Sequence, residues 1–489
     1  MSDHNDAADA NRQAWSNASE WGSNRRMTEF EALMWRSERH PQQSSTILSV
    51  MLLDTAPDWD RLVAAHQWAA QLIPRTRERV VDPVLPVGPP AWTLDEHFRL
   101  DYHLRRVRLP STGTLRAVLD HAAAFALVPL DRNRPLWEAR LVEGLDGGRA
   151  AYLLKMHHSL TDGMGGIELL SSVQSRTREH TPDKPRPRPT DDGEHGTDSI
   201  RLAVNEISER LLASPGVALA AARSGLGLLT RPGSAAGQTL RYAASLRRVL
   251  SPPPATPSPL LRERTGRVWR YGVLECPLTQ LKSAGKAGGG SVNDAFVAAL
   301  LGGLRIYHER HGVQLDRLPM AMPVSLRKAD DPMGGNKWAG ALFASPIGIA
   351  DPAERIAAIR DTVLSLRTEP ALDTFSLLAP LVNRLPAAVG ALFARLGGAA
   401  DMSASNVPGL PYQTYLAGAK VERMYPFGPL PGVAVMAAMV SHVGTCCFGL
   451  NIDGAAVADV DVLLECFEAG LKETLAASKP TIGDEAERS

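Results

Sequence analysis

The chain has 489 residues, of which 44% are hydrophobic and 22% are charged, an ordinary composition for a globular protein. This length predicts two domains of about 200 residues each. The 53 basic and 53 acidic side chains cancel, so the bulk charge gives no reason to expect a nucleic acid as partner.

The four cysteines have no C-x-x-C spacing and are too few for a disulfide scaffold, which suits a reducing cytosol. The N-terminus, "MSDHNDAADANRQ", is polar and acidic and does not resemble a signal peptide. The two longest weakly charged stretches are residues 211–230, which contain an arginine, a proline and three glycines, and residues 432–452, whose pattern is typical of buried strands. We therefore expect a cytoplasmic protein that crosses no membrane. Peripheral contact with the inner face of the cell membrane or with lipid droplets stays open.

Composition and periodicity divide the chain into a polar tail (1–26), a first domain (27–178), a linker (179–260), a second domain (261–478) and a terminal tail (479–489). The linker begins with "EHTPDKPRPRPTDDGEHGTD", which is too rich in proline and charge to pack as a core. Helical spacing resumes in "SIRLAVNEISERLLA". The second domain closes with an amphipathic helix, "DVDVLLECFEAGLKETLAAS".

The region from Arg210 to Arg270 is strongly basic. It holds ten arginines, no lysine and one acidic residue, Glu263, for a net charge of +9. One interpretation is a set of scattered surface arginines. The other is a face for an anionic ligand, such as the phosphates of a cofactor or an acidic lipid surface. The sequence does not separate the two.

Two adjacent histidines, His157 and His158, end a predicted hairpin. "DGG" between two alternating runs predicts antiparallel strands over Trp137–Glu143 and Ala150–His157. The stretch "GIELLSSVQS" after them has helical periodicity, so the pair sits where a strand meets a loop. Because successive side chains of a strand point to opposite faces, only one imidazole can face a substrate.

A histidine suits general-base chemistry because an unperturbed imidazole, with a pKa near 6.5, is largely neutral at cellular pH. Such a group can take the proton of an alcohol that attacks a carbonyl carbon. Asp162 could orient the ring or pair with a distant arginine, and Gly163 permits a backbone conformation that a Cβ would forbid. Ser159 lacks the G-x-S-x-G context of a nucleophile, and the spacing is not that of a metal site. The alternative is a pair of hydrogen-bonded core histidines.

The motif HH-x-x-x-DG, here "HHSLTDG", resembles the signature of the acyl-CoA-dependent acyltransferases, which include chloramphenicol acetyltransferase-like enzymes and the condensation domains of peptide synthetases. Further segments resemble motifs of the bacterial wax ester synthase/diacylglycerol acyltransferase family. They are "MTEFEALMWRSERHPQQ", "RPLWEARLVEGL", "SVNDAFVAAL", "MPVSLRKADDPMGGNKWAGALFASP" and "ASNVPG". Together they span roughly Met27 to Ala476 in the expected order.

This resemblance implies an α/β (α+β) fold of two chloramphenicol acetyltransferase-like domains, each a mixed sheet flanked by helices, joined by a helical linker. A substrate tunnel would run between them. His158 would be the general base, supported by His157 and Asp162, with Asn293 as a candidate donor to the reacting centre. The residues that would shape the tunnel or the interdomain arrangement are Gly163, Pro135, Trp137, Asp294, Arg327, Ser405 and Asn406. Acyl-CoA would be a co-substrate, with no metal and no bound cofactor.

Several of these positions also have simpler interpretations. Pro135 and Trp137 fit the packed entry of a strand, Asn293 and Asp294 fit a helix N-cap, and Ser405–Gly409 fits a turn. Glu38 lies where some relatives place an acidic site residue, but a solvated loop charge is the interpretation we favour. The chain departs from the family pattern at Glu31, where Asp is usual, and at Leu410, where Pro is usual.

The expected reaction is direct transfer of a long-chain acyl group from acyl-CoA to diacylglycerol, giving triacylglycerol, or to a long-chain alcohol, giving a wax ester. Two other hypotheses remain. One is an acyltransferase with a carrier-protein or polyketide-type acceptor, against which the absence of a fused carrier region argues. The other is a catalytically weak protein of the same fold that binds lipid surfaces. Chain-length preference and oligomeric state are not predictable from this sequence.

Overall fold

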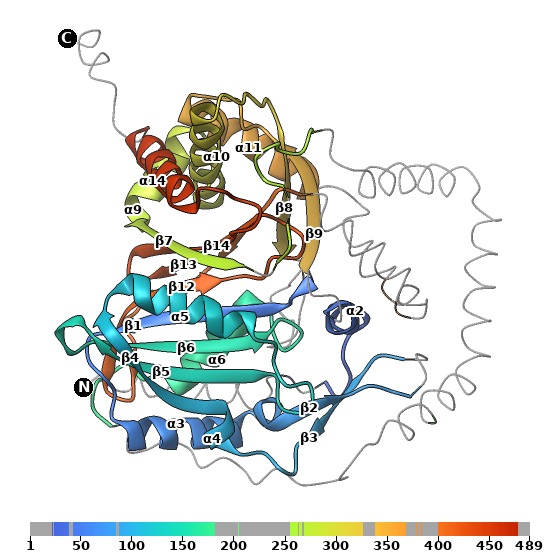
Figure 1. Ribbon diagram of the computed structural model, residues 1–489, viewed down its shortest axis with the longest axis vertical. Helices are drawn as coiled ribbons and strands as arrows, with labels where there is room; N and C mark the ends of the chain where they lie inside the picture. Colours follow the sequence, from blue (N-terminus) through green and yellow to red (C-terminus); the bar gives the residue numbers. More distant parts are fainter. Residues whose placement is uncertain are drawn as a thin grey trace, which may run out of the picture.

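The structure is a computed structural model that describes residues 22, 24–38, 43–84, 88–180, 204, 255–262, 264–266, 268–325, 338–367, 379, 383 and 400–477. These residues form two six-stranded sheets and one small two-stranded sheet. Figure 1 shows the two large sheets one above the other, each with its own helices. Most of the predicted linker, both predicted tails except for residues 22 and 24–26, and Arg327 lie outside the described residues.

The first sheet has the strand order β11–β12–β1–β6–β5–β4. Its members are β1 (Thr46–Leu53), β4 (Leu104–Gly113), β5 (Trp137–Leu145), β6 (Ala150–His157), β11 (Tyr415–Leu416) and β12 (Ala419–Phe427). Strands β5 and β6 pair antiparallel, which confirms the predicted hairpin, and β4 pairs with β5 in parallel. The "DGG" segment forms the turn between β5 and β6. Gly147 and Gly148 both have positive φ there, a conformation that glycine adopts without the steric cost of a side chain.

Strands β11 and β12 come from the range that we expected to form the second domain. β12 pairs antiparallel with β1, so that Pro426 lies opposite Ser49. The first sheet is therefore completed by chain from beyond residue 400, and β12 ties the two halves of the molecule together. Figure 1 shows β12 between β1 and the strands of the second sheet.

Helices cover both faces of the first sheet. α3 (Trp59–Leu72) and α6 (Gly163–Val173) lie on the face of Tyr152 and Met156, where His66 of α3 is 2.7 Å from the Tyr152 hydroxyl. α5 (Leu115–Leu127) covers the opposite face, where the Phe125 ring packs against the Lys155 ammonium. The remaining elements of this half are α2 (Glu29–Ser37), η2 (Pro74–Arg77), β2 (Glu78–Val81), β3 (Ala91–Leu94), α4 (Leu100–His103) and η3 (Asp146–Gly148).

The second sheet has the order β7–β14–β13–β10–β8–β9, and β10 runs parallel to both of its neighbours. Its strands are β7 (Trp269–Pro277), β8 (Leu318–Ser325), β9 (Trp338–Ser345), β10 (Met402–Val407), β13 (Val435–His442) and β14 (Thr445–Asp453). Figure 1 shows its helices on the side away from the first sheet. They are α9 (Leu278–Ala287), α10 (Val292–Arg310), α11 (Pro352–Arg367) and α14 (Val460–Ala476).

The predicted strand character of residues 432–452 is confirmed, because β13 and β14 are antiparallel neighbours joined at Val443 and Gly444. The predicted closing helix is α14. Each half has its own apolar core. Within the described ranges, we find no helix whose length and hydropathy would suffice to cross a bilayer.

Candidate functional site

An apolar cavity lies where the two sheets meet, and together with the open space at its mouth it measures about 730 Å³. The first sheet contributes residues of β1, β6 and β12, the second contributes residues of β10 and β13, and α6 closes one side. The lining residues are Ile47, Leu48, Ser49, Met156, His158, Asp162, Gly163, Gly166, Ile167, Leu170, Ser405, Val407, Met424, Pro426, Phe427, Gly428, Pro429, Met436, Ala438 and Val440. Only four of these, His158, Asp162, Ser49 and Ser405, carry polar side chains.

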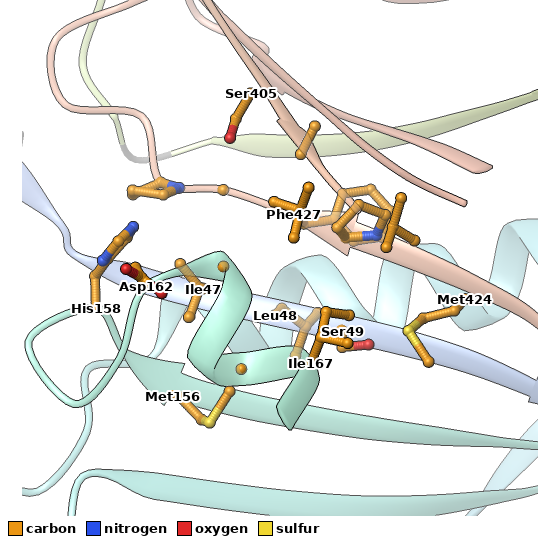
Figure 2. Close-up of a pocket in the computed structure, with 18 of the residues that line it drawn as sticks. Ile47, Leu48, Ser49, Met156, His158, Asp162, Ile167, Ser405, Met424 and Phe427 are labelled. Atoms are coloured by element: carbon orange, nitrogen blue, oxygen red, sulfur yellow. The ribbon is translucent and has the colours of Figure 1, made fainter. Parts of the chain in front are cut away.

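His158 lines this cavity directly after the end of β6. Its backbone N–H donates to the carbonyl of Ser45 at 2.7 Å, which continues the pairing of β6 with β1 past the last strand residue. Figure 2 shows the imidazole beside Asp162, at one end of the row of lining side chains. The side chain of His157 is buried on the opposite side, so the two imidazoles face apart as the strand alternation predicts.

His157 is held by three contacts. Its Nδ1 accepts the backbone N–H of Ser159 at 3.0 Å and lies 2.6 Å from the Ser159 hydroxyl. Its Nε2 lies 3.0 Å from a carboxylate oxygen of Glu38. Since Nδ1 accepts, a neutral ring carries its proton on Nε2, the nitrogen nearer to Glu38.

The prediction that Glu38 is a solvated loop charge is wrong. Besides the contact with His157, its other oxygen accepts the backbone N–H of Ser45 at 3.1 Å. Burial on its own would raise the pKa of Glu38, but His157, the Ser45 N–H and Arg132 together lower it below its ordinary value of 4.5. The only indication in the sequence is that Glu38 lies where some relatives place an acidic site residue, since residues 38 and 157 are far apart along the chain.

Ser159, His157 and Glu38 have the composition of a nucleophile, a base and an orienting acid. However, the Ser159 side chain is sealed from solvent and does not line the cavity. A nucleophile must reach the substrate carbonyl. The burial of Ser159 therefore agrees with the prediction that it is not a nucleophile.

Asp162 and Gly163 begin α6. Asp162 is the N-cap, and its Oδ1 accepts the N–H of Gly165 at 2.9 Å. Gly163 has no room for a side chain, because a Cβ there would lie only 2.5 Å from a methyl carbon of Val407. The glycine of HH-x-x-x-DG therefore allows the second sheet to approach α6 closely. This is a different reason from the expected special backbone conformation, since the φ of Gly163 is not positive.

Pro135 and Trp137 are buried and do not line the cavity. The Trp137 indole N–H donates to the Thr76 carbonyl at 2.8 Å, and its ring stacks on those of His103 and His66. The prediction that they shape the wall of this cavity is wrong, because both lie in the core of the first half. The simpler interpretation, a packed strand entry, describes these contacts.

The "SVNDAF" segment starts α10, as expected, but the N-cap is Ser291 and neither Asn293 nor Asp294. Asp294 is the third helical residue, and its carboxylate accepts both the N–H and the hydroxyl of Ser291. It closes a capping box and does not line the cavity. The Asn293 amide contacts the sulfur of Met322 at 3.8 Å. Asn293 is also not among the lining residues, and its role as a donor stays a prediction.

The "ASNVPG" segment is strand β10 as far as Val407, so the predicted turn over Ser405–Gly409 is wrong for its first residues. Ser405 lines the cavity, while Asn406 is exposed and does not. Of the predicted tunnel residues, the structure therefore brings Gly163 and Ser405 to the cavity with His158 and Asp162. The sequence did not predict the lining residues of β1 and β12. Strand alternation could indicate which side chains of each strand share a face, but only the pairing of β1 with β12 brings the two sets to one cavity.

Part of the basic region can be placed. Arg264 contacts the buried carboxylate of Asp401, and Arg270 lies 3.6 Å from Asp461. These two arginines therefore have protein partners. The arginines of 210–250 lie outside the described residues.

Two family models match the chain. Residues 27–296 match the wax ester synthase/diacylglycerol acyltransferase catalytic domain, and residues 334–474 match the WS/DGAT C-terminal domain. The chain belongs to this family. The family was predicted from the motifs, and these matches confirm it.

Relatives and solved structures agree with this assignment. A Mycobacterium tuberculosis protein, provisionally named a diacylglycerol O-acyltransferase, is 42% identical over 91% of this chain and 90% of its own length. A second protein of that organism, tgs2, is 32% identical over 78% of this chain and 83% of its own. The wax ester synthase/diacylglycerol acyltransferase from Marinobacter aquaeolei VT8 has a TM-score of 0.62 at 22% identity, covering 93% and 100% of the two chains.

The first condensation domain of the CDA synthetase has a TM-score of 0.56 at 15% identity, covering 94% of this chain and 98% of its own. At such identities these likenesses concern the fold alone, and they confirm the expected two-domain α/β architecture. The matching family models and the named relatives make the chain a member of an acyltransferase family. Within the residues that the structure places, no group of three or more His, Cys, Asp or Glu side chains is arranged to hold a metal ion.

Proposed function

We propose that this acyltransferase moves a long-chain acyl group from acyl-CoA to the hydroxyl of diacylglycerol, or of a long-chain alcohol, with His158 as general base. The observation that carries the proposal is the imidazole of His158 in an apolar cavity between the two sheets. An apolar cavity favours alkyl chains by about 0.8 kcal/mol for each methylene removed from water. Diacylglycerol is the acceptor we favour, because two Mycobacterium tuberculosis relatives of this chain carry that activity in their names.

In the proposed reaction, a neutral His158 takes the hydroxyl proton while the oxygen attacks the thioester carbonyl carbon. The tetrahedral intermediate carries a negative oxygen, which preorganised N–H donors or dipoles would stabilise. The N-terminus of α6 borders the cavity at Gly163, and its dipole favours negative charge there. When the carbon–sulfur bond breaks, the proton on His158 passes to the departing CoA sulfur. The acceptor oxygen is now the ester oxygen of the product, and the imidazole of His158 is neutral again.

Holding both substrates in one cavity supplies the orientation that a free collision lacks. His157, Glu38 and Asp162 support His158 in this proposal. They fix the backbone on either side of it, through Ser159 and through the first turn of α6.

The test is a competition between acceptors. The purified full-length protein is incubated with labelled palmitoyl-CoA, and diacylglycerol and hexadecanol are offered together. We expect labelled triacylglycerol as the main product and wax ester as the lesser one. Label that stays in palmitoyl-CoA, or appears only as free fatty acid, would contradict the proposal. Replacing the donor by palmitoyl-acyl-carrier protein should yield no ester.

Because both substrates carry alkyl chains, we also propose that the protein works in peripheral contact with a lipid surface, either the inner face of the membrane or a lipid droplet. Flotation with liposomes that contain diacylglycerol should bring the protein and its esterifying activity to the same fraction. Protein that stays at the bottom of the gradient while it esterifies lipid would argue against this contact.

A further inference from the structure

Ser49 breaks the apolar pattern of the cavity wall. Residues Ile47 and Ser49 of β1 line the cavity, and the Ser49 hydroxyl oxygen is buried. Across the described part of the chain this oxygen has no hydrogen-bond partner. Its cross-strand neighbours explain why, since Pro426 on β12 and Leu154 on β6 offer it no polar side chain.

A buried hydroxyl without a partner is unfavourable, and such groups in native proteins call for an explanation. A bound water would need two or more polar partners. Next to Ser49 on the cavity wall, Pro426 offers no polar side-chain atom and Met424 only a thioether, which is a weak acceptor. A serine hydroxyl can also turn about χ1 among three staggered positions, so it is free to meet a ligand in the cavity.

Ser49 lies well away from the reacting end. Figure 2 shows Ser49 and Met424 at the end of the cavity opposite His158. Thr46 is the cross-strand partner of His157, and Ser49 is three residues further along β1, a rise of about 10 Å. The alkyl chains of one leaflet span about half of the ~30 Å hydrocarbon core of a bilayer. If the reacting carbon of a long-chain substrate lies at His158, the part of its alkyl chain that reaches Ser49 is therefore near or beyond the middle of that alkyl chain.

We propose that Ser49 is a polar subsite for a hydroxyl group near the middle of a long-chain substrate. This inference rests on the proposed function, because it assumes that an alkyl chain runs from His158 along β1 and α6. A plain methylene chain leaves the Ser49 oxygen unpaired, whereas a chain hydroxyl at that depth donates to it or accepts from it. The hydroxyl can be carried by the acyl chain or by the acceptor alcohol, and the chemistry at Ser49 is the same.

The test compares hydroxylated and plain chains in two arms. In the first arm, 10-hydroxyoctadecanoyl-CoA is compared with octadecanoyl-CoA, with diacylglycerol as acceptor. In the second, 1,10-octadecanediol is compared with octadecanol, with palmitoyl-CoA as donor. Each arm gives a ratio of kcat/KM for the hydroxylated over the plain chain, in the wild type, Ser49→Ala, Ser49→Thr and Ser171→Ala. Ser171 is a matched control, because it lies on α6, does not line the cavity, and donates its hydroxyl to the Glu168 carbonyl at 2.7 Å.

We expect the ratio to fall about tenfold in Ser49→Ala in one arm, which identifies the chain that occupies this end of the cavity. Ser49→Thr keeps a hydroxyl and should retain most of the ratio, and Ser171→Ala should leave it unchanged. Equal ratios in the wild type and Ser49→Ala in both arms would overturn the subsite, provided that plain substrates are esterified. If the wild type esterifies no substrate at all, it is the proposed function that fails.

Discussion

Replacing Gly163 by alanine tests how closely the two halves of the molecule must approach at the active cavity. The added Cβ would lie 2.5 Å from one methyl carbon of Val407 and 3.3 Å from the other. Carbon atoms pack at about 3.5–4.0 Å, so the nearer methyl must give way by about 1 Å. Val407 is β-branched and holds its methyl groups stiffly. The strain must therefore move β10 or the start of α6.

The cost in stability should be modest and the cost in activity larger. Overpacking of this kind costs about 1–3 kcal/mol, while alanine in place of glycine gains back about 0.5–1 kcal/mol in a helix. The unfolding free energy should therefore fall by about 1–2 kcal/mol. Gly163 adjoins Asp162 and shares the cavity with His158, and a displacement of about 1 Å at a reacting centre costs on the order of 10²-fold in rate.

The assay is kcat/KM for palmitoyl-CoA with diacylglycerol, measured alongside the unfolding midpoint. Gly166→Ala is the matched control, because it lies in the same helix and its Cβ would meet only Met156 at 3.7 Å and Thr161 at 3.8 Å, which are ordinary contacts. In the Gly163→Ala background, Val407→Ala should restore much of the activity by removing the overlap. Wild-type activity in Gly163→Ala, an equal loss in Gly166→Ala, or no recovery in the double variant would each show that the close approach of Val407 to Gly163 does not limit activity.

Two further predictions concern contacts that the sequence did not show. Because the pKa of Glu38 is lowered below 4.5, the stability from its contacts is fully present above about pH 4.5 and is lost as the pH falls through the lowered pKa. Glu38→Gln should therefore flatten the loss of stability as the pH falls below about 4.5 in denaturant titrations, and an unchanged slope would speak against the contact. Ser291→Ala removes the N-cap of α10 and should lower the unfolding free energy by about 1 kcal/mol without changing kcat. A tenfold fall in kcat would instead link this helix end to the chemistry.

The features that the sequence predicts well are local. The hairpin that ends at His157 follows from two alternating runs around "DGG", and the opposite facing of His157 and His158 follows from the strand period alone. The closing helix α14 follows from periodicity in the same way. The helix at "SVNDAFVAAL" is instead expected from the family resemblance and the capping residues at its start. Each of these needs information from only about twenty neighbouring residues.

The features that it does not predict depend on pairings between distant segments. β12 joins β1 across more than 350 residues of chain, and this pairing sets one wall of the cavity. The contact of Glu38 with His157 and the approach of Val407 to Gly163 have the same origin. The wrong prediction of an N-cap at Asn293 or Asp294 has a local cause instead. Serine, asparagine and aspartate all cap helices, and the chain offers all three within four residues.

The proposed reaction depends on the imidazole of His158 acting as the base that accepts the hydroxyl proton. Ester formation by His158→Ala, compared with the wild type in the same preparation of palmitoyl-CoA and diacylglycerol, tests this most directly when the unfolding midpoints of both are recorded. If His158 is the base, the variant should fold and its kcat should be lower by about 10²- to 10⁴-fold. A folded His158→Ala protein that makes triacylglycerol at nearly the wild-type rate would contradict it.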